Sequence, residues 1–289
     1  MRVRISRERA NEIGEFFRRH GEDIITAFEI RDPQYKALET LYQTLNDCNS
    51  LALLTLLNAL ISYNLSSTGE EYWWEFARYE NFKHYTRDPE KLWDSMRRFL
   101  LTSRGNTMNR EQKLRRLSRV REEEFHIEFY AMADEYMRDL KKLVDRLSEI
   151  MRQSSDDKTI VFTAKMLYYV SKICGIRNPI MEGIRIPVDR RVASVSYTSE
   201  LIEVLAPGNP IEIIFREKEK ALEAWDIVSS ISMIPQIRLD SVIWIMGRYV
   251  REKDPVQRAV RELEIILGRE IKRDIILELA HQMLRRRIE

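Results

Sequence analysis

The chain has 289 residues, of which 44% are hydrophobic and 33% are charged, and its formal net charge at pH 7 is +2. This length and composition allow a sizeable core in one large domain or two closely packed ones, and they exclude an intrinsically disordered protein. Its apolar runs fall short of the ~18 residues of a membrane-spanning helix. Its start carries Glu8, Glu12, Glu15 and Glu22 and lacks a signal-type apolar region. We therefore expect a cytoplasmic protein with no membrane partner.

Apolar residues recur at intervals of three and four along most of the chain, which predicts helices. Only 9 Gly and 8 Pro interrupt them, so the helices should be long and strands few. The predicted helical stretches are 34–45, 51–65, 71–82, 91–101, 124–151, 158–174, 218–231, 239–251, 256–267 and 272–284. The pattern leaves the structure of residues 197–215 open. We expect an all-α fold.

The cysteines and histidines give no sign of a metal centre. Cys48 and Cys174 lie in unrelated apolar segments without a CxxC partner, which predicts two buried thiols. The 4 histidines are scattered without the spacing of metal ligands. We expect neither a metal nor an organic cofactor. The many glutamate, arginine and lysine residues resemble the composition of thermophilic proteins.

One segment concentrates positive charge. Residues 103–121, "SRGNTMNREQKLRRLSRVR", contain a single acid, Glu111. Their basic residues are Arg104, Arg110, Lys113, Arg115, Arg116, Arg119 and Arg121. Such a segment in a near-neutral protein is typical of binding to a polyanion. A solvated helix face that pairs with the following "EEEF" run is an equally good interpretation.

A helix that begins with a lysine is predicted within residues 154–175, "SSDDKTIVFTAKMLYYVSKICG". Asp156 or Asp157 can cap it, which places Lys158 in the first turn. There the helix dipole, together with partial burial, favours the neutral amine that nucleophilic attack requires. Lys158, Lys165 and Lys172 recur every seven residues, close to one face. Taken alone, such a stripe is typical of a solvated face.

An aspartate follows in "IRIPVDRRVASV", after Pro187. Asp189 can cap the next helix, and taken alone that is the favoured interpretation. A "KT" helix start followed by "IPVDRRV" resembles the helix-hairpin-helix DNA glycosylases. In that superfamily the lysine is the nucleophile of the members that also cleave the strand, and the aspartate is present throughout.

The branch that the chain resembles is the archaeal GO glycosylases (AGOG), whose members remove 8-oxoguanine. The general superfamily has a glycine-rich hairpin before the lysine, where this chain has "RQSSDD". Five blocks in order between about residues 25 and 250 carry the resemblance. They are "DPQYKAL", "NALISYNLSSTGEEYWWEF", "DKTIVFTAKM", "IPVDRRV" and "IRLDSVIWIMGR".

The resemblance implies a DNA repair enzyme in which Lys158 attacks C1′ and Asp189 offsets the charge that develops on the sugar. The Schiff base would then allow strand cleavage by β-elimination. The residues that would contact 8-oxoguanine are Gln34, Trp73, Lys165, Asp240 and Trp244. The residues that would contact the DNA backbone are Arg104, Arg110, Lys113, Arg115, Arg116 and Arg119.

It also implies a single glycosylase domain over residues 1–289, made of two packed helical subdomains with a cleft between them. Residues 1–65 with 210–289 would form one subdomain and 66–209 the other, with the helix-hairpin-helix region near 137–200. The protein would act as a monomer on damaged DNA, associated with the nucleoid of a prokaryote.

Some alternatives remain open. Lys165 could be the nucleophile, Trp74 could replace Trp73 in the base site, and Asp240 could be a helix cap after "PQIR". The protein could remove another damaged or mismatched base, or bind DNA without catalysis. The residues after about 252 have no place in the resemblance.

Overall fold

The computed structural model describes residues 2–288. The chain forms two compact units, residues 1–29 with 185–289 (unit 1) and residues 30–184 (unit 2). The breaks fall after helix α1 and before the "IPVD" turn, and they differ from the expected boundaries near residues 65 and 210. The reason is packing, since α2 and α3 belong with α4 and α10, whereas α11 belongs with α12 and α14.

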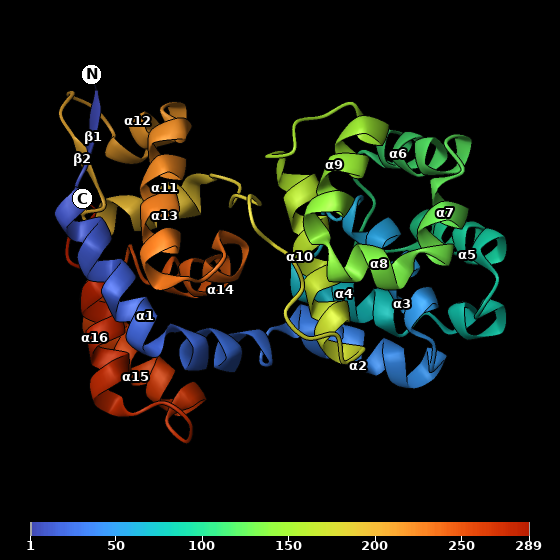
Figure 1. Cartoon of the computed structure of the whole chain (residues 1–289), viewed down its shortest axis with the longest axis horizontal. Helices are drawn as coiled ribbons and strands as arrows, with labels where there is room; N and C mark the ends of the chain where they lie inside the picture. Colours follow the sequence, from blue (N-terminus) through green and yellow to red (C-terminus); the bar gives the residue numbers. More distant parts are fainter. Residues whose placement is uncertain (1, 289) are drawn as a thin grey trace. The chain divides into compact units, whose positions relative to one another are not determined.

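Unit 2 is entirely helical (Figure 1). Its helices are α2 (Pro33–Leu45), α3 (Cys48–Ala59), α4 (Gly69–Ala77), the 3₁₀ helix η1 (Glu80–Tyr85), α5 (Pro89–Thr102), α6 (Arg110–Glu122), α7 (Phe125–Ala131), α8 (Ala133–Arg138), α9 (Leu140–Met151) and α10 (Lys158–Ile173). The stretch expected as one helix over 124–151 is divided at Met132 and Asp139, and Asp139 caps α9 by accepting from the Lys142 amide. Helices α9 and α10 pack against each other, joined by residues 152–157.

Unit 1 contains the chain's only strand pair within residues 2–288. Its elements are β1 (Val3–Ile5), α1 (Arg7–Glu29), α11 (Arg190–Thr198), β2 (Ile202–Val204), α12 (Pro210–Arg216), α13 (Lys218–Ser232), α14 (Gln236–Met246), α15 (Pro255–Leu267) and α16 (Arg273–Met283). The undecided stretch 197–215 holds β2, which pairs antiparallel with β1, and the start of α12. The expected all-α class is confirmed apart from this short pair.

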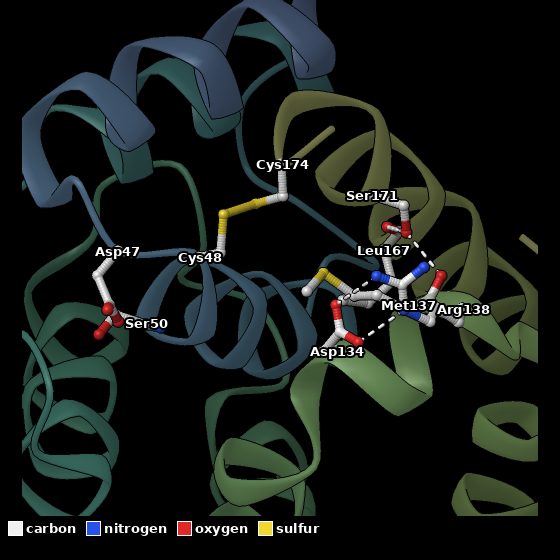
Figure 2. The surroundings of a disulfide bond; sticks show 9 residues. All are labelled: Asp47, Cys48, Ser50, Asp134, Met137, Arg138, Leu167, Ser171 and Cys174. Carbon is white, nitrogen blue, oxygen red and sulfur yellow. Dashed lines mark hydrogen bonds and ion pairs between the residues drawn. A yellow bond between two sulfur atoms is a disulfide. The ribbon is translucent and has the colours of Figure 1, made fainter. Parts of the chain in front are cut away.

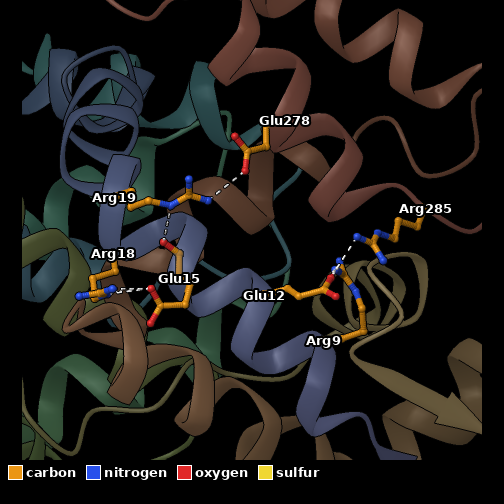
Figure 3. Close-up of polar contacts among 7 residues, drawn as sticks. All are labelled: Arg9, Glu12, Glu15, Arg18, Arg19, Glu278 and Arg285. Carbon is orange, nitrogen blue, oxygen red and sulfur yellow. Dashed lines mark hydrogen bonds and ion pairs between the residues drawn. The ribbon is translucent and has the colours of Figure 1, made fainter.

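The C-terminal helices complete the core of unit 1. Leu263, Leu279 and Met283 are buried in the same apolar cluster as Phe16 and Phe17 of α1. Polar contacts between α1 and the C-terminal segment accompany this packing, as Figure 3 shows for Arg19 with Glu278 and for Glu12 with Arg285. Exposed ion pairs of this kind stabilise a fold little, so apolar burial is what holds α15 and α16 in place.

The two cysteines form a disulfide, so the prediction of two buried thiols is wrong. Cys48 begins α3 and Cys174 is the C-cap of α10 (Figure 2), with their Cα atoms 6.0 Å apart. Both residues are half-buried. Sequence spacing could not reveal the pairing because 126 residues separate the two positions. Proteins of hyperthermophiles are often rich in disulfides, which is consistent with the thermophile-like composition.

We predict that loss of this disulfide destabilises unit 2. The bond closes a long loop, and removing a native disulfide typically costs about 2–5 kcal/mol through the greater freedom of the unfolded chain. Guanidinium unfolding of a Cys48→Ala, Cys174→Ala variant should show that loss against the oxidised parent. Alkylation of both thiols in unfolded protein that was never reduced would contradict the assignment.

Candidate active site

Helix α10 presents Lys158 at its first position. Asp157 is the N-cap residue, with extended backbone (φ −64°, ψ 134°) and no side-chain capping bond. The placement of Lys158 in the first turn is therefore confirmed. Lys158 is exposed, so the expectation of partial burial is wrong. Lys165, on the same helix, is 7% exposed, and its spacing of seven from Lys158 puts the two near one face.

An aromatic contact next to Lys158 was missed in the sequence. Phe162 lies one turn beyond Lys158 and meets Trp73 of α4 edge-on, with ring centroids 6.1 Å apart. Trp73 is 1% exposed and also packs edge-on against Phe76. Trp74 is half-buried beneath the Arg78 guanidinium. The sequence could have indicated this contact, because Phe162 in "VFTAK" is four residues after Lys158 and shares its helix face.

Gln34 is fixed where α2 approaches both α4 and α10. Its backbone N–H donates to the capping carboxylate of Asp32 (2.9 Å), which also accepts from Tyr169 of α10 (2.8 Å). The side-chain nitrogen of Gln34 lies beside Gly69, at the start of α4. A Cβ added at Gly69 would be 3.7 Å from that nitrogen. Unit 2 thus gathers Gln34, Trp73 and the lysine helix through pairwise contacts of three helices.

Asp189 caps α11 in unit 1. Its Oδ1 accepts from the backbone N–H groups of Arg191 (2.9 Å) and Val192 (3.1 Å). The predicted cap is confirmed. A capping carboxylate is fixed by its two amide donors, which is also how a carboxylate with a catalytic role would be oriented. The two roles are therefore compatible at one residue.

Helix α14 sets Asp240 and Trp244 on one face. It begins at Gln236 with Pro235 as N-cap residue, so the alternative of Asp240 as a helix cap is wrong. Trp244 is 38% exposed, and the guanidinium of Arg248 lies 4.4 Å from its ring centroid.

Arg191 joins these residues to Asp189. Its guanidinium lies 4.3 Å from the Trp244 ring centroid. A Cβ at Gly247 would come within 2.3 Å of Arg191 Cγ, so a glycine is required for this approach. Burial lowers the pKa of Arg191, and the carboxylates of Asp189 and Asp240 oppose that shift. Arg191 was not predicted from the sequence as part of the site, although it stands two residues after Asp189.

Lys113 of the basic segment points into unit 2. It is fully buried, and its amine donates to the Asn106 side chain and to the Asn64 carbonyl oxygen (3.2 Å). Burial, with Arg110 acting in the same direction, lowers the pKa of Lys113 to about 8. An enclosed amine with these partners cannot reach a DNA phosphate, so the predicted backbone contact is wrong for this residue.

The other cations of the segment lie nearer the surface. Arg110 is half-buried and donates to the Ser103 carbonyl oxygen (3.0 Å). Arg119 donates to the carbonyl oxygen of Met151 (2.9 Å). The exposed members are Arg104, Arg115, Arg119 and Arg121, of which Arg121 forms ion pairs with Glu90 and Asp94. Arg116 is half-buried, with its contacts at the start of α10.

Between residues 2 and 288 no three histidine, cysteine or acidic side chains are grouped as metal ligands would be. Within the same range no helix combines the length and apolarity needed to cross a membrane.

Known proteins resemble the chain over nearly its whole length. Residues 14–278 match the AGOG family, described as N-glycosylase/DNA lyase. An N-glycosylase/DNA lyase of Aeropyrum pernix is 33% identical over 99% of this chain and 98% of its own. One of Methanopyrus kandleri is 35% identical over 77% of this chain and 83% of its own. A crystal structure of the 8-oxoguanine DNA glycosylase of Pyrobaculum aerophilum with 8-oxoguanosine superposes with a TM-score of 0.70 and 27% identity, covering 96% of this chain and 97% of that one.

The shared fold makes this chain a helix-hairpin-helix DNA glycosylase. Within that class, it belongs to the N-glycosylase/DNA lyase family AGOG. The resemblance and the enzyme class expected from the sequence are thereby confirmed. The family match also reaches residue 278 and so includes α15 and part of α16, the segment that had no place in the sequence comparison.

A buried ion pair holds α14, the helix that carries Asp240 and Trp244, against α1. Arg238 is 9% exposed and donates to Glu29 (3.1 Å), which is fully buried, and to Glu22. Breaking a buried pair from one side is costly because the remaining charge stays in a low-dielectric interior.

We predict that Arg238→Ala lowers the free energy of unfolding by about 3–5 kcal/mol. Glu22→Ala is the matched control, because the Glu22 side chain is 68% exposed and its loss should cost about 0–1 kcal/mol. Urea titrations followed by tryptophan fluorescence give both values. Equal, small losses for the two variants would show that the pair does not hold α14.

Proposed function

We propose that this protein excises 8-oxoguanine from DNA and cleaves the strand, with Lys158 as nucleophile and Asp189 as the electrostatic partner. The observation that carries the proposal is an exposed lysine at the first turn of a buried helix, in a chain of the N-glycosylase/DNA lyase family. The Pyrobaculum relative with bound 8-oxoguanosine supports the choice of base. The exposure of Lys158 and the burial of Lys165 favour Lys158 as the attacking amine.

The reaction follows from the chemistry of an amine. Lys158 Nζ forms a bond to C1′ while the bond from C1′ to the base breaks, and the base leaves with the electron pair. The Asp189 carboxylate stabilises the positive charge that grows on the sugar. Opening of the sugar ring leaves a Schiff base between Nζ and C1′. Loss of a C2′ proton then expels the 3′ phosphate, which nicks the strand, and water releases the lysine.

Recognition requires the base to leave the duplex stack, because its glycosidic bond cannot be reached there. By resemblance to the family, the base would contact the Gln34 amide, the Trp73 and Trp244 rings, Lys165 and Asp240. The Gln34 oxygen would accept from N7–H, a proton that 8-oxoguanine has and guanine lacks. Guanine has an unprotonated N7, which is itself an acceptor. It would face the Gln34 oxygen without a hydrogen bond, and this disfavours the binding of guanine.

Phosphate contacts would come from the cations that remain at the surface. Arg104, Arg115 and Arg119 are exposed, and Arg110 is half-buried. Such contacts set position on DNA without reading sequence.

We predict that borohydride traps a covalent adduct between the parent protein and a duplex with one 8-oxoguanine. Lys158→Gln should abolish the adduct, because an amide cannot form a Schiff base. Lys165→Gln is the matched control on the same helix, and it should weaken base binding yet still form the adduct. Denaturing gels of labelled DNA give the measurement, with an undamaged duplex as the blank.

Either of two outcomes would overturn the assignment. An adduct lost only in Lys165→Gln would move the nucleophile seven residues along the helix. An intact protein that releases no 8-oxoguanine and forms no adduct would be a DNA-binding protein without this activity.

The two roles of Asp189 can be separated by substitution. Asparagine caps a helix as well as aspartate does, so Asp189→Asn should leave the free energy of unfolding within about 0.5 kcal/mol. The single-turnover rate should nevertheless fall by about 100-fold or more, since the neutral amide cannot offset the charge on the sugar. Asp189→Ala should lose the rate and also about 0.5–2 kcal/mol of stability. If Asp189→Asn reacted at the parent rate, Asp189 would serve only as a helix cap.

A further inference from the structure

A short loop precedes Lys158. Residues 152–157 join α9 to α10, and Arg152 adopts a left-handed backbone conformation (φ 54°). The Asp157 N–H donates to the Ser154 carbonyl oxygen (3.0 Å), but the Asp157 side chain makes no capping bond to α10. The Asp157 side chain therefore does not cap the start of the lysine helix.

Arg116 of α6 contacts residues on both sides of Lys158. Its Nη2 donates to Thr159 Oγ1 at 2.8 Å and to the Gln153 side-chain oxygen. One nitrogen thus joins the residue after Lys158 to a residue at the other end of the loop. The guanidinium also lies 5.4 Å from the centroid of the Tyr63 ring. This cation–π contact is a third interaction that restrains the Arg116 side chain.

Partial burial strengthens the hydrogen bonds that Arg116 donates. Arg116 is half-buried, and desolvation lowers its pKa while Tyr63 and Asp157 act in the opposite direction. A hydrogen bond from a charged, partly desolvated donor is stronger and shorter than one between neutral groups at the surface. On the next turn, Arg119 Nη1 donates to the Met151 carbonyl oxygen (2.9 Å) at the end of α9. Helix α6 therefore holds both sides of the loop.

We propose that Arg116 is a positioning residue, which holds the first turn of α10 and thereby the backbone of Lys158. The inference rests on the proposed role of Lys158. Lys158 has a long, exposed side chain, so its attack on C1′ requires that the backbone from which it extends is fixed. A displacement of about 1 Å in such a group can slow a reaction about 100-fold.

A phosphate contact is the competing role for an arginine in this segment, and the two roles leave different signatures. Removing a phosphate contact weakens DNA binding and reduces the slope of log affinity against log salt by about 1. Removing a positioning residue leaves affinity and slope in place and slows the chemical step.

The test uses full-length Arg116→Ala and Thr159→Val, which remove the two partners of one hydrogen bond. Single-turnover nicking is measured with enzyme in excess over a duplex containing 8-oxoguanine. We expect the rate to fall about 10- to 100-fold in each variant. The double variant should be no slower than the slower single one, because both remove the same bond. Arg116→Lys, which can still donate to Thr159, should recover part of the rate.

Binding is measured in a Lys158→Gln background, so that no substrate is consumed, at several salt concentrations. Arg116→Ala and Thr159→Val should keep the affinity within about twofold and the slope unchanged. Arg115→Ala, the exposed neighbour, is the positive control and should lower the slope by about 1. Weakened binding and a reduced slope in Arg116→Ala, with the rate at saturation retained, would overturn the proposal in favour of a phosphate contact.

The outcomes separate this inference from the proposed function. If Lys158→Gln retains the borohydride adduct, the nucleophile itself is wrong. If that adduct is lost but Arg116→Ala and Thr159→Val react at the parent rate, only the positioning role fails. If Arg116→Ala does not fold, Thr159→Val decides the question, since valine keeps the shape of threonine and removes only the acceptor.

Discussion

The burial of helix α10 is the constraint on which unit 2 depends. Its residues are buried from Ile160 to Ser171, apart from the half-buried Phe162. A helix that is enclosed on all sides belongs to the core of a domain, so it cannot shift without disrupting its neighbours. Only its ends can present a reactive group to solvent, and Lys158 stands at one of them. The other end is joined to α3 by the disulfide of Cys174.

Unit 1 also carries its polar groups on helices that are fixed in place, but by different interactions. Its α14 is held to α1 by the buried guanidinium of Arg238, and its α11 is capped by Asp189. Arg191 then links the capped turn to the exposed Trp244 ring on α14. In both units, a polar group that serves the proposed chemistry is attached to an element fixed by burial, which is what a preorganised site requires.

Local features of the fold were readable from the sequence, and long-range ones were not. The first-turn position of Lys158 and the capping role of Asp189 follow from residue types that favour helix starts. The disulfide joins positions 126 residues apart, and strand β1 finds its partner near residue 203. Neither pairing has a local signal. The 23-residue helix α1 was not predicted either, because charged residues dilute its apolar pattern.

The basic segment shows where composition misleads and helical register does not. Lys113, Leu117 and Val120 are buried, and Arg116 completes that face at i+3 from Lys113. Arg115 is exposed, and Arg119 is exposed although it also donates to the Met151 carbonyl oxygen. A count of charges alone predicts that all of these cations lie on one surface that could bind a polyanion. The periodicity of a helix divides them into a face that holds the protein together and a face that remains for DNA. The charge of a segment is therefore only an upper bound on the charge that a nucleic acid can meet.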